Sequence, residues 1–125
     1  MIRSLGIAIA DDEEDIRQYF RRLLPILGYR LVAEAQNGHE LVELCLSEKP
    51  DLVITDVMMP EISGIEAAVE INKTRSVPVI ILSSRERPSR KDEGKTETTG
   101  IVDYLQKPVS LSDLKAAILR ACPAA

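Results

Sequence analysis

The 125-residue sequence contains no tryptophan, one histidine and two cysteines. Cys45 and Cys122 both lie among aliphatic residues at helical spacing, which is typical of packing thiols and argues against a disulfide framework. The first apolar stretch is far shorter than a signal-peptide core, and no later run approaches the length that spans a membrane. We therefore expect a protein of a reducing compartment, cytoplasmic and without a membrane segment.

A basic surface is also missing. The net charge is −4 and the pI is near 5.1, whereas chains that bind a phosphate backbone carry an excess of lysine and arginine. We expect no direct binding to nucleic acid, and partners that are proteins or cations. With 45% hydrophobic residues, the chain can bury one substantial core but not two, so residues 1–125 are predicted to form one domain.

What the sequence does contain is a regular alternation of short aliphatic runs and helix-period segments. The runs mostly do not alternate with polar residues, which is typical of strands buried on both faces of a parallel sheet. The predicted strands are Gly6–Ala10, Leu31–Ala35, Leu52–Thr55, Val77–Leu82 and Ile101–Leu105. Right-handed crossovers would place helices on both faces of this five-stranded α/β sheet.

Each helical segment carries apolar residues on one face. The predicted faces are Ile16, Tyr19, Phe20, Leu23 and Leu27, then Leu41, Leu44 and Cys45, then Ile65, Ala68 and Val69, and last Leu111, Leu114, Ile118 and Ala121. Ser110 is a candidate cap for the last helix, and Asn37-Gly38 supplies a turn before the second. Pro25 should kink the first helix or end it early.

Polar side chains gather where the predicted strands end, and sheets of this kind bind ligands at the carboxyl ends of their strands. These residues are Asp11 and Asp12 after the first strand, Asp56 after the third, Ser83 and Ser84 after the fourth, and Lys107 after the fifth. We expect them to converge. Neighbouring carboxylates repel, so their pKa values rise unless a cation neutralises them.

Oxygen ligands favour a hard cation such as Mg²⁺, with Mn²⁺ as an alternative. With the cation in place, Asp56 can act as a nucleophile toward a phosphoryl donor, while the cation and the Lys107 ammonium absorb charge on the transferred oxygens. A hydroxyl at the end of the fourth strand would then bind the new phosphoryl group and convert the reaction into a loop movement.

Four segments resemble, in order and spacing, the receiver domains of bacterial response regulators. They are IADDE (9–13), ITDVMMP with Gly64 (54–64), PVIILSS (78–84) and DYLQKP (103–108), and the resemblance covers essentially the whole chain. It implies a flavodoxin-like, doubly wound sheet and a two-component phosphoacceptor switch, which receives its phosphoryl group from a sensor histidine kinase or a phosphotransfer protein. Such a domain is a regulator, not an enzyme, and assists only its own phosphorylation and dephosphorylation.

The resemblance also implies a role for each site residue. Asp56 would be phosphorylated, and Asp12, Asp56 and the backbone carbonyl of Met58 would bind Mg²⁺ directly, with Asp11 assisting through water. Lys107 would pair with the phosphoryl group.

The remaining implied roles belong to the switch. Ser83 would be the switch hydroxyl, with Ser84 as the alternative if the strand end slips by one residue. Tyr104 would follow that switch by a change of rotamer, although a packed edge aromatic is equally compatible with its position. The Lys107-Pro108 peptide bond is a candidate cis bond.

Other interpretations compete with this one. Asp11 and Asp12, taken alone, could be acids that cap a helix, and His39 is expected to be a solvated surface residue.

A haloacid-dehalogenase-like phosphatase would need a second aspartate at the position of Met58. A flavodoxin-like FMN carrier would need a hydroxyl-rich loop where the acidic run 11–13 stands. The third alternative is a degenerate receiver that acts as an unphosphorylated interaction module.

The segment from Arg85 to Thr99 departs from the family. It contains no apolar residue, so a helix formed there has no stripe to bury against the sheet. We predict a displaced, shortened or mobile fourth helix; the alternative is an ordinary solvated helix held by charge pairs. The cognate kinase, the output domain or downstream protein and the oligomeric state, a homodimer included, stay open.

Overall fold

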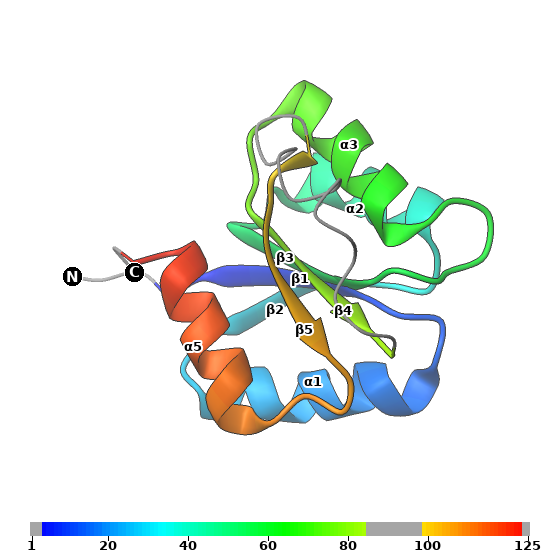
Figure 1. Ribbon diagram of the computed structural model, residues 1–125. Helices are drawn as coiled ribbons and strands as arrows, with labels where there is room; N and C mark the ends of the chain where they lie inside the picture. Colours follow the sequence, from blue (N-terminus) through cyan, green and yellow to red (C-terminus); the bar gives the residue numbers. More distant parts are fainter. Residues whose placement is uncertain (1–3, 85–98, 124–125) are drawn as a thin grey trace.

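The structure is a computed structural model that describes residues 4–84 and 99–123. Within these ranges the chain forms five strands and four helices (Figure 1). In chain order they are β1 Gly6–Ala10, α1 Glu14–Ile26, β2 Arg30–Ala35, α2 Gly38–Glu48, β3 Leu52–Asp56, α3 Gly64–Thr74, β4 Val79–Ser83, β5 Ile101–Gln106 and α5 Leu111–Ala121.

The strands form one sheet in the order β2-β1-β3-β4-β5, and each neighbouring pair is parallel. Helices α1 and α5 lie on one face, and α2 and α3 lie on the other (Figure 1). The strand order reverses between β1 and β3, which creates the crevice where open α/β sheets bind ligands. The predicted flavodoxin-like, doubly wound five-stranded parallel sheet with helices on both faces is confirmed.

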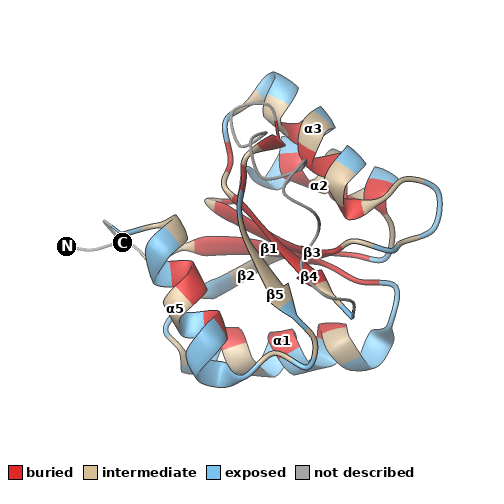
Figure 2. Ribbon diagram, viewed as in Figure 1, coloured by how far each residue is buried: buried red, intermediate tan, exposed pale blue. Residues whose placement is uncertain are grey.

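Two apolar cores lie on either side of the sheet (Figure 2). One packs side chains of β1, β3 and β4 against α2 and α3, and the other packs the opposite faces of these strands against α1 and α5. All residues of β1 and β3 are buried, as continuous aliphatic strands between two helix layers must be. β2 lies at an edge of the sheet and is only partly buried. Among the described residues, no helix is long and apolar enough to cross a membrane.

The predicted bounds of β1, β2, β3 and β5 are correct to within one residue, whereas those of β4 are shifted further. β4 runs from Val79 to Ser83 instead of from Val77 to Leu82. Pro78 has no N–H to donate, although its carbonyl accepts a hydrogen bond from Val53 N at 3.0 Å. The adjacent Val77 N–H donates to the Asn72 side chain at 2.9 Å instead of to a strand.

Most of the predicted helix faces are at least partly buried. The predicted residues that are fully buried are Phe20, Leu41, Cys45, Ala68, Leu114 and Ile118. Two predictions are wrong, because Tyr19 is 41% exposed and Leu111 is 48% exposed. In α1 the buried positions are Arg17, Phe20 and Leu24, so the helix is turned to bring an arginine toward the sheet. The cysteines Cys45 and Cys122 are both free thiols.

Side-chain caps begin three of the helices. As predicted, Ser110 caps α5, where its hydroxyl accepts a hydrogen bond from Asp113 N at 3.1 Å. Asn37 likewise caps α2. The capping box of α3 was not predicted from the sequence. In it, Ser63 and Glu66 each accept a backbone N–H from the other. α1 passes through Pro25 and ends at Ile26, so the proline lies in the last turn of that helix.

Gly64, the first residue of α3, sits against the backbone of Asp56. Its N–H donates to Val57 O at 2.9 Å, and a Cβ at this position would lie 2.1 Å from the Asp56 carbonyl oxygen. Because that oxygen belongs to a buried strand end, it has little freedom to move away. Glycine at position 64 therefore allows α3 to approach the loop that carries Asp56.

We predict that Gly64→Ala lowers the free energy of unfolding by about 1–3 kcal/mol, the usual cost of overpacking. Urea unfolding monitored by circular dichroism measures this change. Gly28→Ala is the control. The Gly28 backbone has a φ of +90°, and a Cβ added there would meet nothing within 4 Å. This substitution should therefore lower the free energy of unfolding by about 1–2 kcal/mol through backbone strain alone. Only Gly64→Ala should also reduce the reactivity of the Asp56 carboxylate. A Gly64→Ala protein as stable as the unaltered one would contradict the prediction.

The predicted fourth helix, and the prediction that it is atypical or mobile, concern residues 85–98 and lie outside the described residues. The last residue of that segment, Thr99, is described and is buried. Its carbonyl accepts a hydrogen bond from the Asn72 side chain at 2.9 Å, which ties the start of β5 to α3.

Candidate functional site

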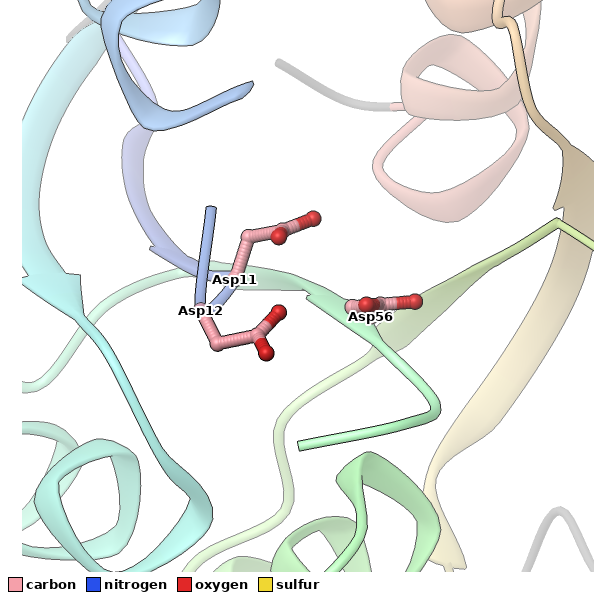
Figure 3. Close-up of side chains that lie close together, drawn as sticks. All are labelled: Asp11, Asp12 and Asp56. Carbon is pink, nitrogen blue, oxygen red and sulfur yellow. The ribbon is translucent and has the colours of Figure 1, made fainter. Parts of the chain in front are cut away.

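An acidic cluster occupies the edge of the sheet where β1 and β3 end. Asp11 and Asp12 directly follow β1, and Asp56 is the last residue of β3. One carboxylate oxygen of each lies within 4.8 Å of the others (Figure 3). The cluster therefore sits in the crevice between the two strands at which the strand order reverses.

Lys107, which follows β5, joins this cluster. Its Nζ atom lies 2.8 Å from Asp11 Oδ2 and 3.4 Å from Asp56 Oδ2. Its backbone N–H donates to Ser83 O at 2.7 Å, so the ends of β4 and β5 are tied together beside the ammonium. The Lys107-Pro108 peptide bond is cis, as predicted. The Lys107 ammonium thus bridges two carboxylates, that of Asp11 after β1 and that of Asp56 at the end of β3.

The three carboxylates have different surroundings. Asp11 and Asp56 are buried, whereas Asp12 is exposed. Both oxygens of Asp11 are engaged, Oδ1 by the Glu13 N–H at 2.9 Å and Oδ2 by Lys107. Within the described residues, Asp12 makes no hydrogen bond or ion pair. Asp12 therefore has its carboxylate oxygens to offer a ligand, and Asp56 contacts the Lys107 ammonium less closely, at 3.4 Å, than Asp11 does, at 2.8 Å.

The electrostatics of the cluster are set by burial. Burial, with repulsion from Asp11, raises the pKa of Asp56, and the attraction of Lys107 only partly opposes that rise. For Lys107, burial would lower the pKa, but the hydrogen bond to Asp11 and the attraction of both carboxylates raise it above its ordinary value. The lysine is therefore charged at neutral pH, whereas ionisation of Asp56 lowers the stability of the folded protein.

The residues present fit a divalent cation. Among the described residues, the cluster holds three carboxyl groups and one ammonium, that of Lys107, so its acidic groups outnumber its basic ones. The cluster offers a metal ion only carboxylate oxygens. Oxygen ligands favour hard cations such as Mg²⁺ over Zn²⁺, which prefers nitrogen and sulfur ligands. A divalent cation would balance the charge and oppose both the burial and the repulsion from Asp11 that raise the pKa of Asp56.

The other predicted site residues lie around this cluster. Ser83 is the last residue of β4 and pairs with Gln106 of β5, while Ser84 is exposed beyond the strand end. Tyr104 lies on β5 and packs partly buried against the core formed with α2 and α3. Met58 follows Asp56 in the loop before α3, and its side chain is exposed. All four residues lie on segments that lead to or from the carboxyl edge of the sheet.

One polar residue beside the cluster was not predicted from the sequence. Arg17 is buried in α1 and donates to the backbone carbonyl of Asp11 at 2.7 Å. A signal was available, because Arg17 stands three residues before the buried Phe20 and seven before the buried Leu24, a helical spacing that puts it in the core stripe. His39 is exposed on α2 in a groove that faces α3, in agreement with its predicted surface position.

Comparison with known proteins identifies the family. The sequence model of the response regulator receiver domain family matches residues 7–119 of this chain. The transcriptional regulatory protein PdtaR of Mycobacterium tuberculosis is 42% identical over 112 residues, which cover 90% of this chain and 54% of PdtaR. The response regulator MprA of Mycolicibacterium vanbaalenii is 37% identical over 118 residues, covering 91% of this chain and 50% of MprA. The chain thus spans about half the length of these curated relatives.

Solved structures agree with this assignment. A response regulator receiver domain protein from Clostridium thermocellum aligns with a TM-score of 0.78 and 32% identity, covering 95% of this chain and 94% of that one. The receiver domain of the response regulator NarL from Mycobacterium tuberculosis shares the fold, with a TM-score of 0.85 at 21% identity and coverage of 99% and 100%. The chain belongs to the response regulator receiver domains, the regulatory phosphoacceptor domains of two-component systems.

Proposed function

We propose that residues 1–125 form a single receiver domain that accepts a phosphoryl group on Asp56, and that this modification changes its interaction surface. The observation that carries the proposal is the placement of the Asp56 carboxylate. It ends a buried strand, lies within 4.8 Å of two further carboxylates and is 3.4 Å from the Lys107 ammonium. Receiver domains interact with histidine kinases, and we infer a sensor histidine kinase or a phosphotransfer protein as the donor.

In the transfer step, a carboxylate oxygen of Asp56 forms a bond to phosphorus as the bond from phosphorus to the donor's histidine nitrogen breaks. The electron pair of the broken bond stays on that nitrogen, which the donor can protonate. Lys107 offsets the charge on the phosphoryl oxygens, because its ammonium already lies between Asp11 and Asp56. To reach the phosphoryl group, Lys107 exchanges part of its contact with Asp11.

The site would hold Mg²⁺, or Mn²⁺ in its place, through Asp12, Asp56 and the backbone carbonyl of Met58, with Asp11 assisting through water. The cation supplies charge neutralisation at the transferred phosphoryl group. The exposed Asp12, which has no protein partner within the described residues, is suited to this role. Asp11 is less free because both of its oxygens are engaged.

Phosphorylation would be sensed at the ends of β4 and β5. Ser83, with Ser84 as the alternative, would bind the phosphoryl group through its hydroxyl, and Tyr104 would change rotamer in response. The Lys107 N–H donates to the Ser83 carbonyl, so a movement of Ser83 is transmitted directly to the residue that holds the phosphoryl group. The segment of the chain that follows Ser83 would carry the change to a partner.

Incubation with acetyl phosphate and Mg²⁺, followed by intact-mass analysis, tests this function. We expect one phosphoryl adduct on the unaltered protein and none on Asp56→Asn, which keeps the size of the side chain but lacks the nucleophilic carboxylate. Asp51→Asn is a matched control because Asp51 lies at the opposite, amino-terminal end of β3; it should retain the adduct. Absence of an adduct on the unaltered protein would instead favour an unphosphorylated interaction module.

A further inference from the structure

A buried arginine lies beneath the acidic cluster without belonging to it. Arg17 is 7% exposed and faces the sheet from α1, in a stripe that is otherwise apolar. A buried guanidinium is costly unless hydrogen bonds and opposite charges surround it. The contacts of Arg17 show what it holds in place.

Each nitrogen of the Arg17 guanidinium has a partner. Nη1 donates to the Asp11 carbonyl oxygen at 2.7 Å, Nε donates to Glu34 at 3.2 Å, and Nη2 donates to Glu14. Arg21 completes the network by donating to both Glu14 and Glu34. Arg17 therefore connects α1 and β2 to the loop after β1, whereas Arg21 connects only α1 and β2.

The Asp11 carbonyl belongs to the peptide unit that leads directly into Asp12. The backbone of Asp11 is thus held on two sides, since its N–H donates to Ala35 O at 3.1 Å and its carbonyl accepts from Arg17. The Asp12 side chain makes no hydrogen bond or ion pair of its own within the described residues. Its position is therefore determined by the backbone on either side of it. Arg17 fixes the plane of the preceding peptide unit, and the Asp11 carboxylate accepts the N–H of the next residue, Glu13, at 2.9 Å.

We propose that Arg17 is a positioning residue for the cation site: it orients the Asp11–Asp12 peptide so that the Asp12 carboxylate faces Asp56. This inference rests on the proposed function, because it concerns the affinity of the same site for Mg²⁺. Arg17 touches neither the acidic side chains of the cluster nor the Lys107 ammonium in the described contacts. It acts through the backbone alone.

The sign of the effect separates positioning from simple electrostatics. Arg17 carries a positive charge near a site for a cation, so electrostatics alone predicts that its removal tightens Mg²⁺ binding. Loss of positioning predicts the opposite, because a misplaced Asp12 loses its contact with the ion. Arg21 is a matched comparison: it has the same charge and both glutamate partners, but it makes no contact with the Asp11 carbonyl.

The experiment is a ¹H–¹⁵N NMR titration with Mg²⁺ on the full chain. We expect Arg17→Met to raise the Kd on the order of tenfold, the usual effect of removing a group that orients a ligand. Arg21→Met should change the Kd by less than about twofold, as expected for an exposed charge pair. An Arg17→Met protein that binds Mg²⁺ as tightly as, or more tightly than, the unaltered protein would overturn the inference. So would equal losses in the two variants.

A second pair of variants tests the proposal in case Arg17→Met does not fold. Arg17→Lys keeps the charge and one donor group, and we expect a Kd between those of the unaltered protein and Arg17→Met, while Arg21→Lys should match the unaltered protein. Identical Kd values for the two lysine variants would overturn the proposal even if Arg17→Met fails to fold. If the unaltered protein shows no Mg²⁺-dependent shifts, the cation site itself is refuted, which is a different result from a site that binds Mg²⁺ without help from Arg17.

Discussion

We expect Asp12→Ala to bind Mg²⁺ more than about tenfold more weakly than the unaltered protein, because a hard cation in this cluster depends on few anionic oxygens and water competes for each position. Asp12 is the one carboxylate of the cluster that is exposed and makes no polar contact within the described residues. Removing it costs the folded protein no internal hydrogen bond. The loss therefore appears in cation affinity and not in the stability of the cation-free protein.

Thermal unfolding at fixed Mg²⁺ concentrations measures this difference. At a concentration of 100 times the Kd, the cation stabilises a protein that binds it only when folded by about 2.7 kcal/mol, and a tenfold weaker Kd reduces this gain to about 1.4 kcal/mol. Asp15→Ala is the control, since it removes the same charge from an exposed position at the start of α1. The prediction is wrong if Mg²⁺ raises the melting temperature of Asp12→Ala as much as that of Asp15→Ala.

The central strands and the acidic residues at their ends could be predicted from the sequence because both follow from one rule. Aliphatic runs without polar alternation must be buried on both faces, and a polar residue at the end of such a run must emerge at the edge of the sheet. Asp11 after β1 and Asp56 at the end of β3 are of this kind. Their positions depend on strand ends, which a shift of one residue hardly changes.

The orientation of α1 could not be predicted as well. Hydrophobicity alone places Tyr19 on the buried face and Arg17 outside it, yet the structure buries Arg17 and leaves Tyr19 41% exposed. The difference arises because Glu34 lies on a neighbouring strand and the Asp11 carbonyl lies on a loop. Helical spacing does align Arg17 with Phe20 and Leu24. Its partners, however, become neighbours only after the sheet has formed, so the spacing alone does not reveal why an arginine can be buried there.

The close approach of α3 to β3 is a similar case. A glycine at the start of a helix indicates a turn or a tight contact, but the sequence does not reveal which atom it approaches. In the structure that atom is the carbonyl oxygen of Asp56. Gly64 and Arg17 thus both act on the backbone of the acidic loops, from the two opposite helix layers (Figure 1). The positions of the carboxylates are set by contacts that do not involve the carboxylates themselves.

The cluster therefore combines a well-fixed backbone with unfavourable charge. Asp11 is paired with Lys107 at 2.8 Å, whereas Asp56 is farther from the same ammonium, at 3.4 Å. Lys107 thus compensates Asp11 better than Asp56, and the charge of the carboxylate proposed as the nucleophile is only partly compensated. A buried carboxylate with partial compensation destabilises the folded protein and favours any reaction or ligand that removes the repulsion.

The pH dependence of stability should reveal this charge directly. Burial and repulsion from Asp11 raise the pKa of Asp56 in the folded protein, against the attraction of Lys107. A carboxyl group with a raised pKa binds more protons in the folded state than in the unfolded state, so its contribution to stability falls as pH rises from about 4 through the folded pKa, and is constant above it. In the absence of divalent cations, Asp56→Asn should therefore be more stable than the unaltered protein at neutral pH.

Urea unfolding in EDTA, carried out on both proteins between about pH 4 and pH 8, isolates this effect. The stability difference in favour of Asp56→Asn should be small at the acidic end, increase through the folded pKa of Asp56 and then stay level. Groups that do not contact Asp56, such as Glu34, whose pKa the hydrogen bond from Arg21 lowers, titrate in both proteins and cancel in the difference. Saturating Mg²⁺ should reduce or reverse the difference, because the cation stabilises only the protein that retains the Asp56 carboxylate. A difference that is independent of pH, or that favours the unaltered protein in EDTA at pH 8, would show that Lys107 fully compensates the charge of Asp56.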